Sequence, residues 1–175
     1  MEETFKNKVA ESGILTINLE DFYPERETAV FDVKEYLYMG LILKEKEFRA
    51  ALQTTNWEMY RDKYVAVLCT ADAIIPVWAY MLIASALQPF AKDVVFGDEK
   101  TLINTVMIKK LAALDGKEFQ DKRVVVKGCG EIQIPEAAYL EITNRLRPWA
   151  RSIMYGEPCS TVPIFKKPLP GSSRG

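Results

Sequence analysis

The chain has 175 residues, of which 49% are hydrophobic and 27% are charged, and its formal net charge is −1. This composition is typical of a globular protein, and the length is sufficient for a sizeable core. Acidic and basic residues are interspersed. This excludes the basic stripe of a nucleic-acid-binding protein, so no nucleic-acid partner is expected.

The sequence contains no histidine and three cysteines, Cys69, Cys129 and Cys159. The lack of histidine excludes Ser-His-Asp and Cys-His catalytic groups, histidine-ligated zinc and histidine proton transfer. Any chemistry must therefore use cysteine, carboxyl, lysine, tyrosine or backbone groups. In a cytoplasmic protein, three cysteines do not indicate a disulfide framework.

Two features predict a cytoplasmic protein with no membrane partner. Residues 1–13, MEETFKNKVAESG, lack the apolar segment of a signal peptide. The longest apolar run, residues 73–87, contains Pro76 and Ser85 and is shorter than the roughly 20 residues that a membrane span needs. We therefore expect this run to form a buried helix.

The N-terminal third of the chain predicts one strand followed by two helices. Apolar and polar residues alternate over residues 14–19, which predicts a strand. Asp32 is suited to cap a helix that runs through Tyr38. Gly40 interrupts this helix, and a second helix is predicted to continue to Ala51.

From residue 63 onward, short apolar strands alternate with helices three times. The predicted strands are residues 63–69, 92–97 and 122–128, and the predicted helices are residues 76–87, 101–114 and 135–146. This alternation is typical of a parallel sheet covered on both faces. The sequence therefore predicts an α/β fold, a single domain over residues 1–167 with a central, largely parallel, Rossmann-like sheet flanked by helices. A disordered tail is predicted over residues 168–175.

Residues 60–87 and 119–146 resemble each other at a constant offset of 59 residues. Both contain a valine-rich strand, a loop, a proline and a helix, with identical residues at positions such as Asp62 and Asp121. The resemblance indicates an internal β–α duplication. The alternative is that all strand–turn–helix units share this pattern.

Each of the two segments has a cysteine near the carboxyl end of its strand, Cys69 in one and Cys129 in the other. An acidic residue, Asp72 or Glu131, follows two or three positions later. Ligands of open α/β sheets bind at this edge, where helix N-termini favour the thiolate form of cysteine. If the two copies adjoin, these four residues converge on one site.

Three cysteines and one carboxylate can bind zinc tetrahedrally or offer thiolates to iron. The predicted metal ligands are Cys69, Asp72, Cys129 and Cys159, with Glu131 and Glu157 as alternative carboxylates. The simpler alternative is that each cysteine only fills space, because free cysteine is among the most buried residue types.

Two of the cysteines are also candidate catalytic nucleophiles. Cys129 lies between two glycines and Cys159 lies in a turn-rich segment, so either thiol is suited to carry a persulfide or to relay electrons. Without histidine, a helix terminus, Lys166 or Lys167 would have to stabilise the thiolate. A neighbouring glutamate would then shuttle the proton.

Four segments of the chain carry a family resemblance. They are GLILKEKEFR (40–49), ADAIIPVWAYML (71–82), KGCGEIQIPEAAY (127–139) and above all SIMYGEPCSTVPIFKK (152–167). With these segments the chain resembles, over nearly its whole length, a bacterial family known as a domain of unknown function. The resemblance implies members encoded beside SUF-type iron–sulfur assembly genes, and hence iron–sulfur assembly proteins as partners. The GCG segment is also similar to the cysteine loop of scaffold proteins in that pathway, whose metal site uses three cysteines and an aspartate. This second likeness is an analogy only.

Together these observations predict a cytoplasmic binding or accessory protein with a cysteine-rich, metal-binding locus that takes zinc or iron in iron–sulfur or sulfur handling. One alternative is a cysteine-dependent enzyme of sulfur transfer or thiol redox chemistry. Another is a protein-interaction module whose cysteines are structural and whose N-terminal helices and C-terminal segment contact the partner.

Overall fold

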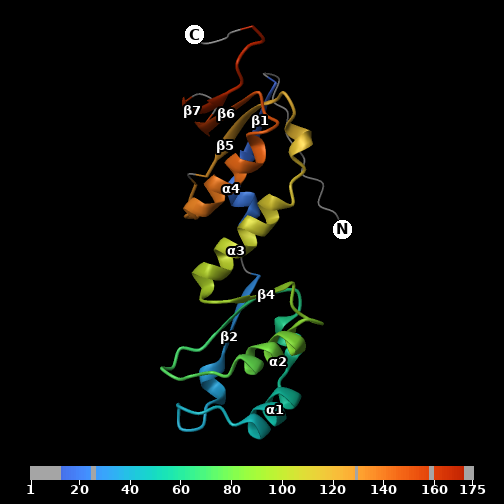
Figure 1. The fold of residues 1–175 in the computed structure, drawn as a ribbon, viewed down its shortest axis with the longest axis vertical. Coiled ribbons are helices and arrows are strands. Elements are labelled where there is room, and N and C mark those ends of the chain that lie inside the picture. The colour runs from blue at the N-terminus through green and yellow to red at the C-terminus, as the bar shows by residue number, and fades with distance from the viewer. Residues whose placement is uncertain (1–12, 25–26, 129, 158–159, 172–175) are drawn as a thin grey trace. The chain divides into compact units, whose positions relative to one another are not determined.

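The computed structural model of the protein describes residues 13–24, 27–128, 130–157 and 160–171. The chain divides into two compact units, each with a sheet of its own (Figure 1). Unit 1 comprises Met1–Tyr23 and Met107–Gly175, and unit 2 comprises Pro24–Val106.

Unit 2 contains a three-stranded parallel sheet in the order β2-β3-β4. Its strands are β2 (Thr28–Asp32), β3 (Tyr64–Leu68) and β4 (Asp93–Phe96). Its helices are α1 (Glu45–Thr54), α2 (Val77–Leu87) and the first half of α3 (Glu99–Ala112).

The central strand of unit 2, β3, is buried on both faces, which explains its uninterrupted apolar sequence. Val65 and Val67 belong to a buried cluster that includes Ile83 of α2. Ala66, between them, belongs to a second cluster that includes Leu102 of α3. Because alternate residues of a strand point to opposite faces, α2 and α3 cover opposite faces of this sheet.

Unit 1 contains a four-stranded sheet in the order β1-β5-β6-β7. Its strands are β1 (Ile14–Asn18), β5 (Arg123–Lys127), β6 (Ser152–Glu157) and β7 (Ser160–Lys166). The strands β1, β5 and β6 are parallel, whereas β7 pairs antiparallel with β6. Helix α4 (Glu136–Leu146) lies across this sheet (Figure 1). The central strand β5 again has three consecutive buried valines, which are Val124, Val125 and Val126.

The two units repeat one arrangement of elements. Strand β5 begins 59 residues after β3 and has the same length, and α4 stands in the same relation to α2. The 3-10 helices Trp57–Tyr60 and Gly116–Phe119, which precede these strands, follow the same offset. The strands β2 and β1 each pair in parallel with the central strand and lead into a 3-10 helix, Val33–Tyr36 or Leu19–Phe22.

The backbone just before each central strand is repeated as well. Asp62 and Asp121 have φ values of 59° and 57°, a left-handed conformation that aspartate adopts more readily than most residues. Their N–H groups donate hydrogen bonds of 3.0 and 2.9 Å to the carbonyl oxygens of Phe90 and Trp149. The same turn and the same hydrogen bond occur in both units, which supports the predicted duplication.

The predicted α/β class and the largely parallel pairing are confirmed. The strands form two sheets rather than one central sheet, because each copy of the repeated unit supplies three parallel strands and the helix that covers them. A single domain over residues 1–167 stays a prediction. Residues 168–171 of the predicted tail contain no helix or strand, and residues 172–175 lie outside the described part of the chain.

Three strands were not predicted from the sequence. The segment predicted as a helix through Tyr38 contains only the 3-10 helix Val33–Tyr36, although Asp32 is its cap as expected, and β2 precedes it. The strands β6 and β7 were also missed. β6 ends in Gly156 and Glu157, and β7 contains Pro163, a residue that favours sheet edges and bulges.

The apolar run that was predicted as a buried helix forms α2 only from Val77 onward, with Pro76 as its N-terminal cap residue. The helix is buried on one face only: Ala79, Ile83 and Leu87 are buried, whereas Val77 and Met81 are exposed. Among the residues that the structure describes, no helix is long and apolar enough to cross a membrane.

The duplication allows a matched test of the two cores. Leu87 and Leu146 occupy equivalent positions of α2 and α4 and are completely buried. We expect Leu87→Ala and Leu146→Ala each to lower the free energy of unfolding by about 2–5 kcal/mol, because each leaves a cavity. Urea-induced unfolding followed by circular dichroism measures both changes.

The controls are Met81→Ala and Leu140→Ala, which are equivalent positions on the exposed faces of the same helices, 71% and 70% exposed. These changes should cost less than about 0.5 kcal/mol. If a buried leucine proved as tolerant as its exposed control, the assigned helix register would be wrong.

Candidate functional site

A polar pocket of about 160 Å³ lies at the carboxyl ends of the parallel strands of unit 1. It is lined by Asn18, Glu20, Lys127, Gly128, Gly130 and Glu157. These residues end or directly follow β1, β5 and β6. Parallel α/β sheets bind ligands at this edge, so the polar pocket is the candidate functional site.

Glu20 gives the polar pocket an acceptor without a partner. The side chain of Asn18 accepts a hydrogen bond of 3.1 Å from the Glu20 N–H, which starts a 3-10 helix at the end of β1. The Glu20 Oε1 atom is buried and has no hydrogen-bond partner among the described residues. Because an unsatisfied buried oxygen costs free energy, a donor or cation bound beside it would be stabilised.

Two glycines make room at this site. A Cβ atom added at Gly130 would overlap the carboxyl group of Glu20, and one added at Gly128 would overlap the hydroxyl group of Tyr139 on α4. Both glycines are thus required for close approach of side chains to the loop that follows β5.

The charge of the polar pocket is balanced only in part. Lys127 Nζ lies 2.9 Å from Glu157 Oε1, and both side chains are partly exposed. Glu20 adds a second carboxyl group against this one lysine. The pocket is therefore better suited to a cation or a hydrogen-bond donor than to an anion.

The predicted residues Cys129 and Cys159 lie outside the described residues. Both neighbours of Cys129 in the chain line the polar pocket, as does Glu157, two positions before Cys159. Gly128 and Gly130 flank Cys129, and Glu157 pairs with Ser160 across the two positions that include Cys159. Glu131 is exposed in the loop before α4.

The other predicted ligands, Cys69 and Asp72, belong to unit 2. Cys69 is half-buried against the core of that unit, and its Sγ donates a hydrogen bond of 3.6 Å to the Ala71 carbonyl oxygen. Across the described ranges, no three cysteine or acidic side chains are grouped so that they could hold a metal ion. The convergence of the four predicted ligands stays a prediction.

The lysines expected to stabilise a thiolate lie at the other end of the sheet. Lys166 pairs with Ser152 at the start of β6, and Lys167 Nζ lies 3.1 Å from Asp121 Oδ1. Lys166 is the last residue of β7 and Lys167 follows it, so both lie at the opposite end of this strand from Ser160. Lys127 is instead the lysine that lines the polar pocket, and the sequence analysis missed it, as it missed Asn18 and Glu20.

The corresponding corner of unit 2 is closed by its own side chains. Asp32, which ends β2, accepts hydrogen bonds from Thr70 N at 3.1 Å and from Thr70 Oγ1 at 2.6 Å. Burial raises the pKa of Asp32, but the hydrogen bonds from Thr70 and Lys34 outweigh it and hold this pKa below its usual value. Thr70 precedes Cys129 by 59 residues, so unit 1 has a cysteine where unit 2 closes this corner.

The chain belongs to the family described as "Protein of unknown function (DUF2480)", whose model matches residues 3–167. This match confirms the resemblance to a family of unknown function. No curated protein and no solved structure matched the chain.

The contact between Gly130 and Glu20 can be tested with a double-mutant cycle. We expect Gly130→Ala to lower the free energy of unfolding by about 1–3 kcal/mol, because the added methyl group displaces the buried carboxyl group. In a Glu20→Ala background the same change should cost less than about 0.5 kcal/mol. Equal costs in both backgrounds, measured by urea unfolding, would contradict this geometry.

The corner of unit 2 should make stability depend on pH. Because the pKa of Asp32 is lower in the folded state, its stabilisation is present above the unfolded-state pKa and is lost as the pH falls through the folded-state pKa. Asp32→Ala should therefore cost about 1–2 kcal/mol at neutral pH and much less below about pH 3. Thr70→Val removes one of the hydrogen bonds and should show a smaller loss with the same pH trend. A loss that is constant from pH 7 to about pH 2 would exclude this role of Asp32.

Proposed function

We propose that this protein binds a thiophilic ligand in the polar pocket of unit 1, and that the ligand is a zinc or iron ion used in iron–sulfur or sulfur handling. The observation that carries the proposal is the buried Glu20 Oε1, which has no hydrogen-bond partner in the described part of the chain and lies in a pocket whose lining residues flank Cys129. A bound cation would satisfy this oxygen.

The thiols would supply the ligands that Glu20 alone lacks. Cys129 stands between two pocket-lining glycines, and Cys159 is one position from Ser160, the residue that pairs with Glu157 at the same edge. Two thiolates with one or two carboxylates form a suitable ligand set for zinc or iron.

Three features support a binding role for this edge. The carboxyl ends of parallel strands are the usual ligand site of an α/β sheet. The pocket carries an excess of carboxyl groups, which attracts cations. The equivalent corner of unit 2 is closed by Asp32 and Thr70, so the opening in unit 1 is not a requirement of the repeated fold.

The sequence resemblance and the cysteine content support the proposed cellular setting of this function. The resemblance of the C-terminal segment implies iron–sulfur assembly proteins as partners, and the cysteine content suits the cytoplasm. The protein would then hold or deliver a metal ion or sulfur for those partners rather than catalyse a reaction that needs histidine.

The metal content of the full-length chain tests the proposal. Protein purified without chelator should contain close to one zinc or iron per chain, measured by elemental analysis. Cys129→Ser, Cys159→Ser and Glu20→Gln should each weaken metal binding at least about tenfold, because each removes one ligand.

The matched control is Cys69→Ser, which removes a cysteine of unit 2 that already donates to the Ala71 carbonyl oxygen. It should leave metal content unchanged. Metal-free protein whose thiols all react freely would exclude the metal site. A metal-free protein with one thiol that is alkylated well below about pH 8 would favour the nucleophilic alternative instead.

A further inference from the structure

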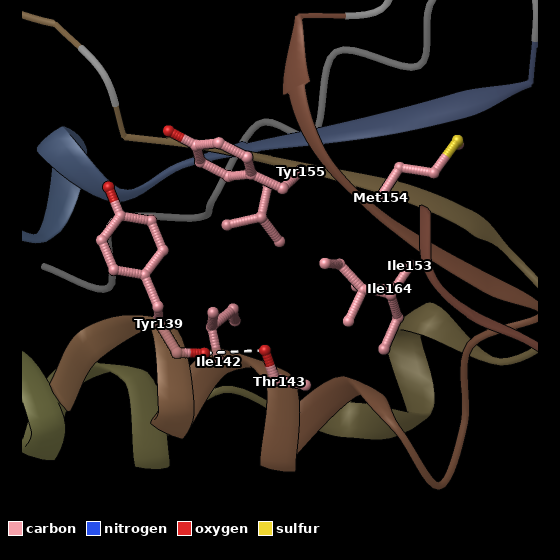
Figure 2. A pocket seen from close by; sticks show the side chains of 8 residues that line it. Tyr139, Ile142, Thr143, Ile153, Met154, Tyr155 and Ile164 are labelled. Carbon is pink, nitrogen blue, oxygen red and sulfur yellow. Dashed lines mark hydrogen bonds between the residues drawn. The ribbon is translucent and has the colours of Figure 1, made fainter. Parts of the chain in front are cut away.

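A second, apolar cavity of about 400 Å³ lies in unit 1 between α4 and the strands β6 and β7 (Figure 2). It is lined by Val126, Tyr139, Ile142, Thr143, Ile153, Met154, Tyr155 and Ile164. Its volume is within the range of about 300–1,000 Å³ that small-molecule sites occupy. The lining residue Ile164 is 52% exposed, so it is in contact with solvent.

Two of the three hydroxyl groups that line the apolar cavity lie at one end, and the third, that of Thr143, donates to the Tyr139 carbonyl oxygen. Figure 2 shows the hydroxyl groups of Tyr139 and Tyr155 on the same side, whereas Ile153 and Ile164 lie at the other. The hydroxyl of Tyr139 also approaches Gly128, which lines the polar pocket. The polar end of the apolar cavity therefore faces the carboxyl edge of the sheet.

The wall formed by β7 depends on an irregular strand. The pairing of β6 with β7 shifts register between Ile153 and Met154, whose partners are Phe165 and Pro163. Ile164 has no partner in this register and lines the cavity. Extra residues of this kind redirect side chains beside binding sites.

Unit 2 shows which parts of this cavity the fold itself requires. The ring pair of Tyr139 and Tyr155, with centroids 5.9 Å apart, corresponds to Tyr80 and Phe96 at 5.2 Å, and both pairs meet edge to face. The pair is common to both units. The second hydroxyl group and the strand β7 occur only in unit 1, where they complete the cavity.

We propose that the apolar cavity binds the hydrocarbon chain of a small amphiphile with a hydrogen-bond-donating head group, an amine or an alcohol. The chain lies along Ile142, Ile153 and Ile164, and the head contacts the tyrosine hydroxyls at the polar end. An anionic head is disfavoured, because the adjoining polar pocket holds two glutamates against one lysine. This inference does not depend on the proposed metal site.

The head-group preference is tested with probes that share one tail. Decylamine, decanol and decanoate are titrated into the full-length protein by calorimetry. We expect decylamine and decanol to bind at least about tenfold more tightly than decanoate, since the nearby carboxyl groups repel the acid. Decanoate binding as tight as decylamine would overturn the assigned head group, and no binding of any probe near 1 mM, an affinity of about −4 kcal/mol, would overturn the site.

Three variants test the location of the site. Thr143→Trp should fill the cavity and abolish binding. Tyr155→Phe should weaken decanol about fivefold, since it removes one hydrogen-bonding group. The fold should tolerate this change, because unit 2 has phenylalanine at the equivalent position 96. Ile164→Ser, on an exposed part of the edge strand, should also weaken all three probes.

The matched controls are Ala84→Trp and Tyr80→Phe at the equivalent positions of α2. They should leave the affinity for every probe unchanged, and unchanged affinity in both Tyr155→Phe and Ile164→Ser would exclude the cavity. Cys129→Ser should alter metal content but not probe binding. Tyr155→Phe should weaken probe binding but leave metal content unchanged. Failure of this inference is therefore distinguishable from failure of the metal site.

Discussion

Burial of a short valine-rich strand on both faces is the constraint on which each unit of this protein depends. The strands β3 and β5 expose almost none of their three central side chains. A strand of this kind is stable only between parallel neighbours with covering layers on both sides. This requirement fixes the long connections through α2 and α4, and it places the carboxyl ends of three strands at one edge. The polar pocket of unit 1 lies at that edge because of how the core is built.

The duplication separates what the fold needs from what the site needs. Both units keep the left-handed aspartate before the central strand and its hydrogen bond to the turn that follows α2 or α4. The two units differ at the carboxyl edge. Unit 2 closes its corner with Asp32 and Thr70, whereas unit 1 leaves Glu20 Oε1 without a partner among the described residues. Features that differ between two copies of one fold are better candidates for function than features that both copies share.

The sequence predicted the elements whose apolar pattern is strong and local. The strands β3 and β5 and the helices α2 and α4 follow from valine runs and from proline at the helix start. The strands β2, β6 and β7 were missed, because their pairing is set by distant partners and two of them contain glycine or proline. For the site, the sequence analysis predicted Cys69 and Cys129 near strand ends but did not identify Glu20 or Lys127. In the sequence, a single polar residue near a strand end cannot be distinguished from an ordinary loop residue. Its role becomes visible only when the strand ends are known to lie together in the sheet.

A position-by-position comparison of the two units shows that Cys69 and Cys129 do not occupy equivalent positions. Cys69 corresponds to Gly128, whereas Cys129 corresponds to Thr70. Burial raises the pKa of Tyr80, and the Cys69 thiol raises it further. Both side chains pack against the core cluster of unit 2. In unit 1 a glycine occupies that position, and the Tyr139 hydroxyl approaches the backbone there. At this position the cysteine of unit 2 fills space. The glycine of unit 1 instead leaves room for the Tyr139 hydroxyl group, which brings this group of the apolar cavity to the border of the polar pocket.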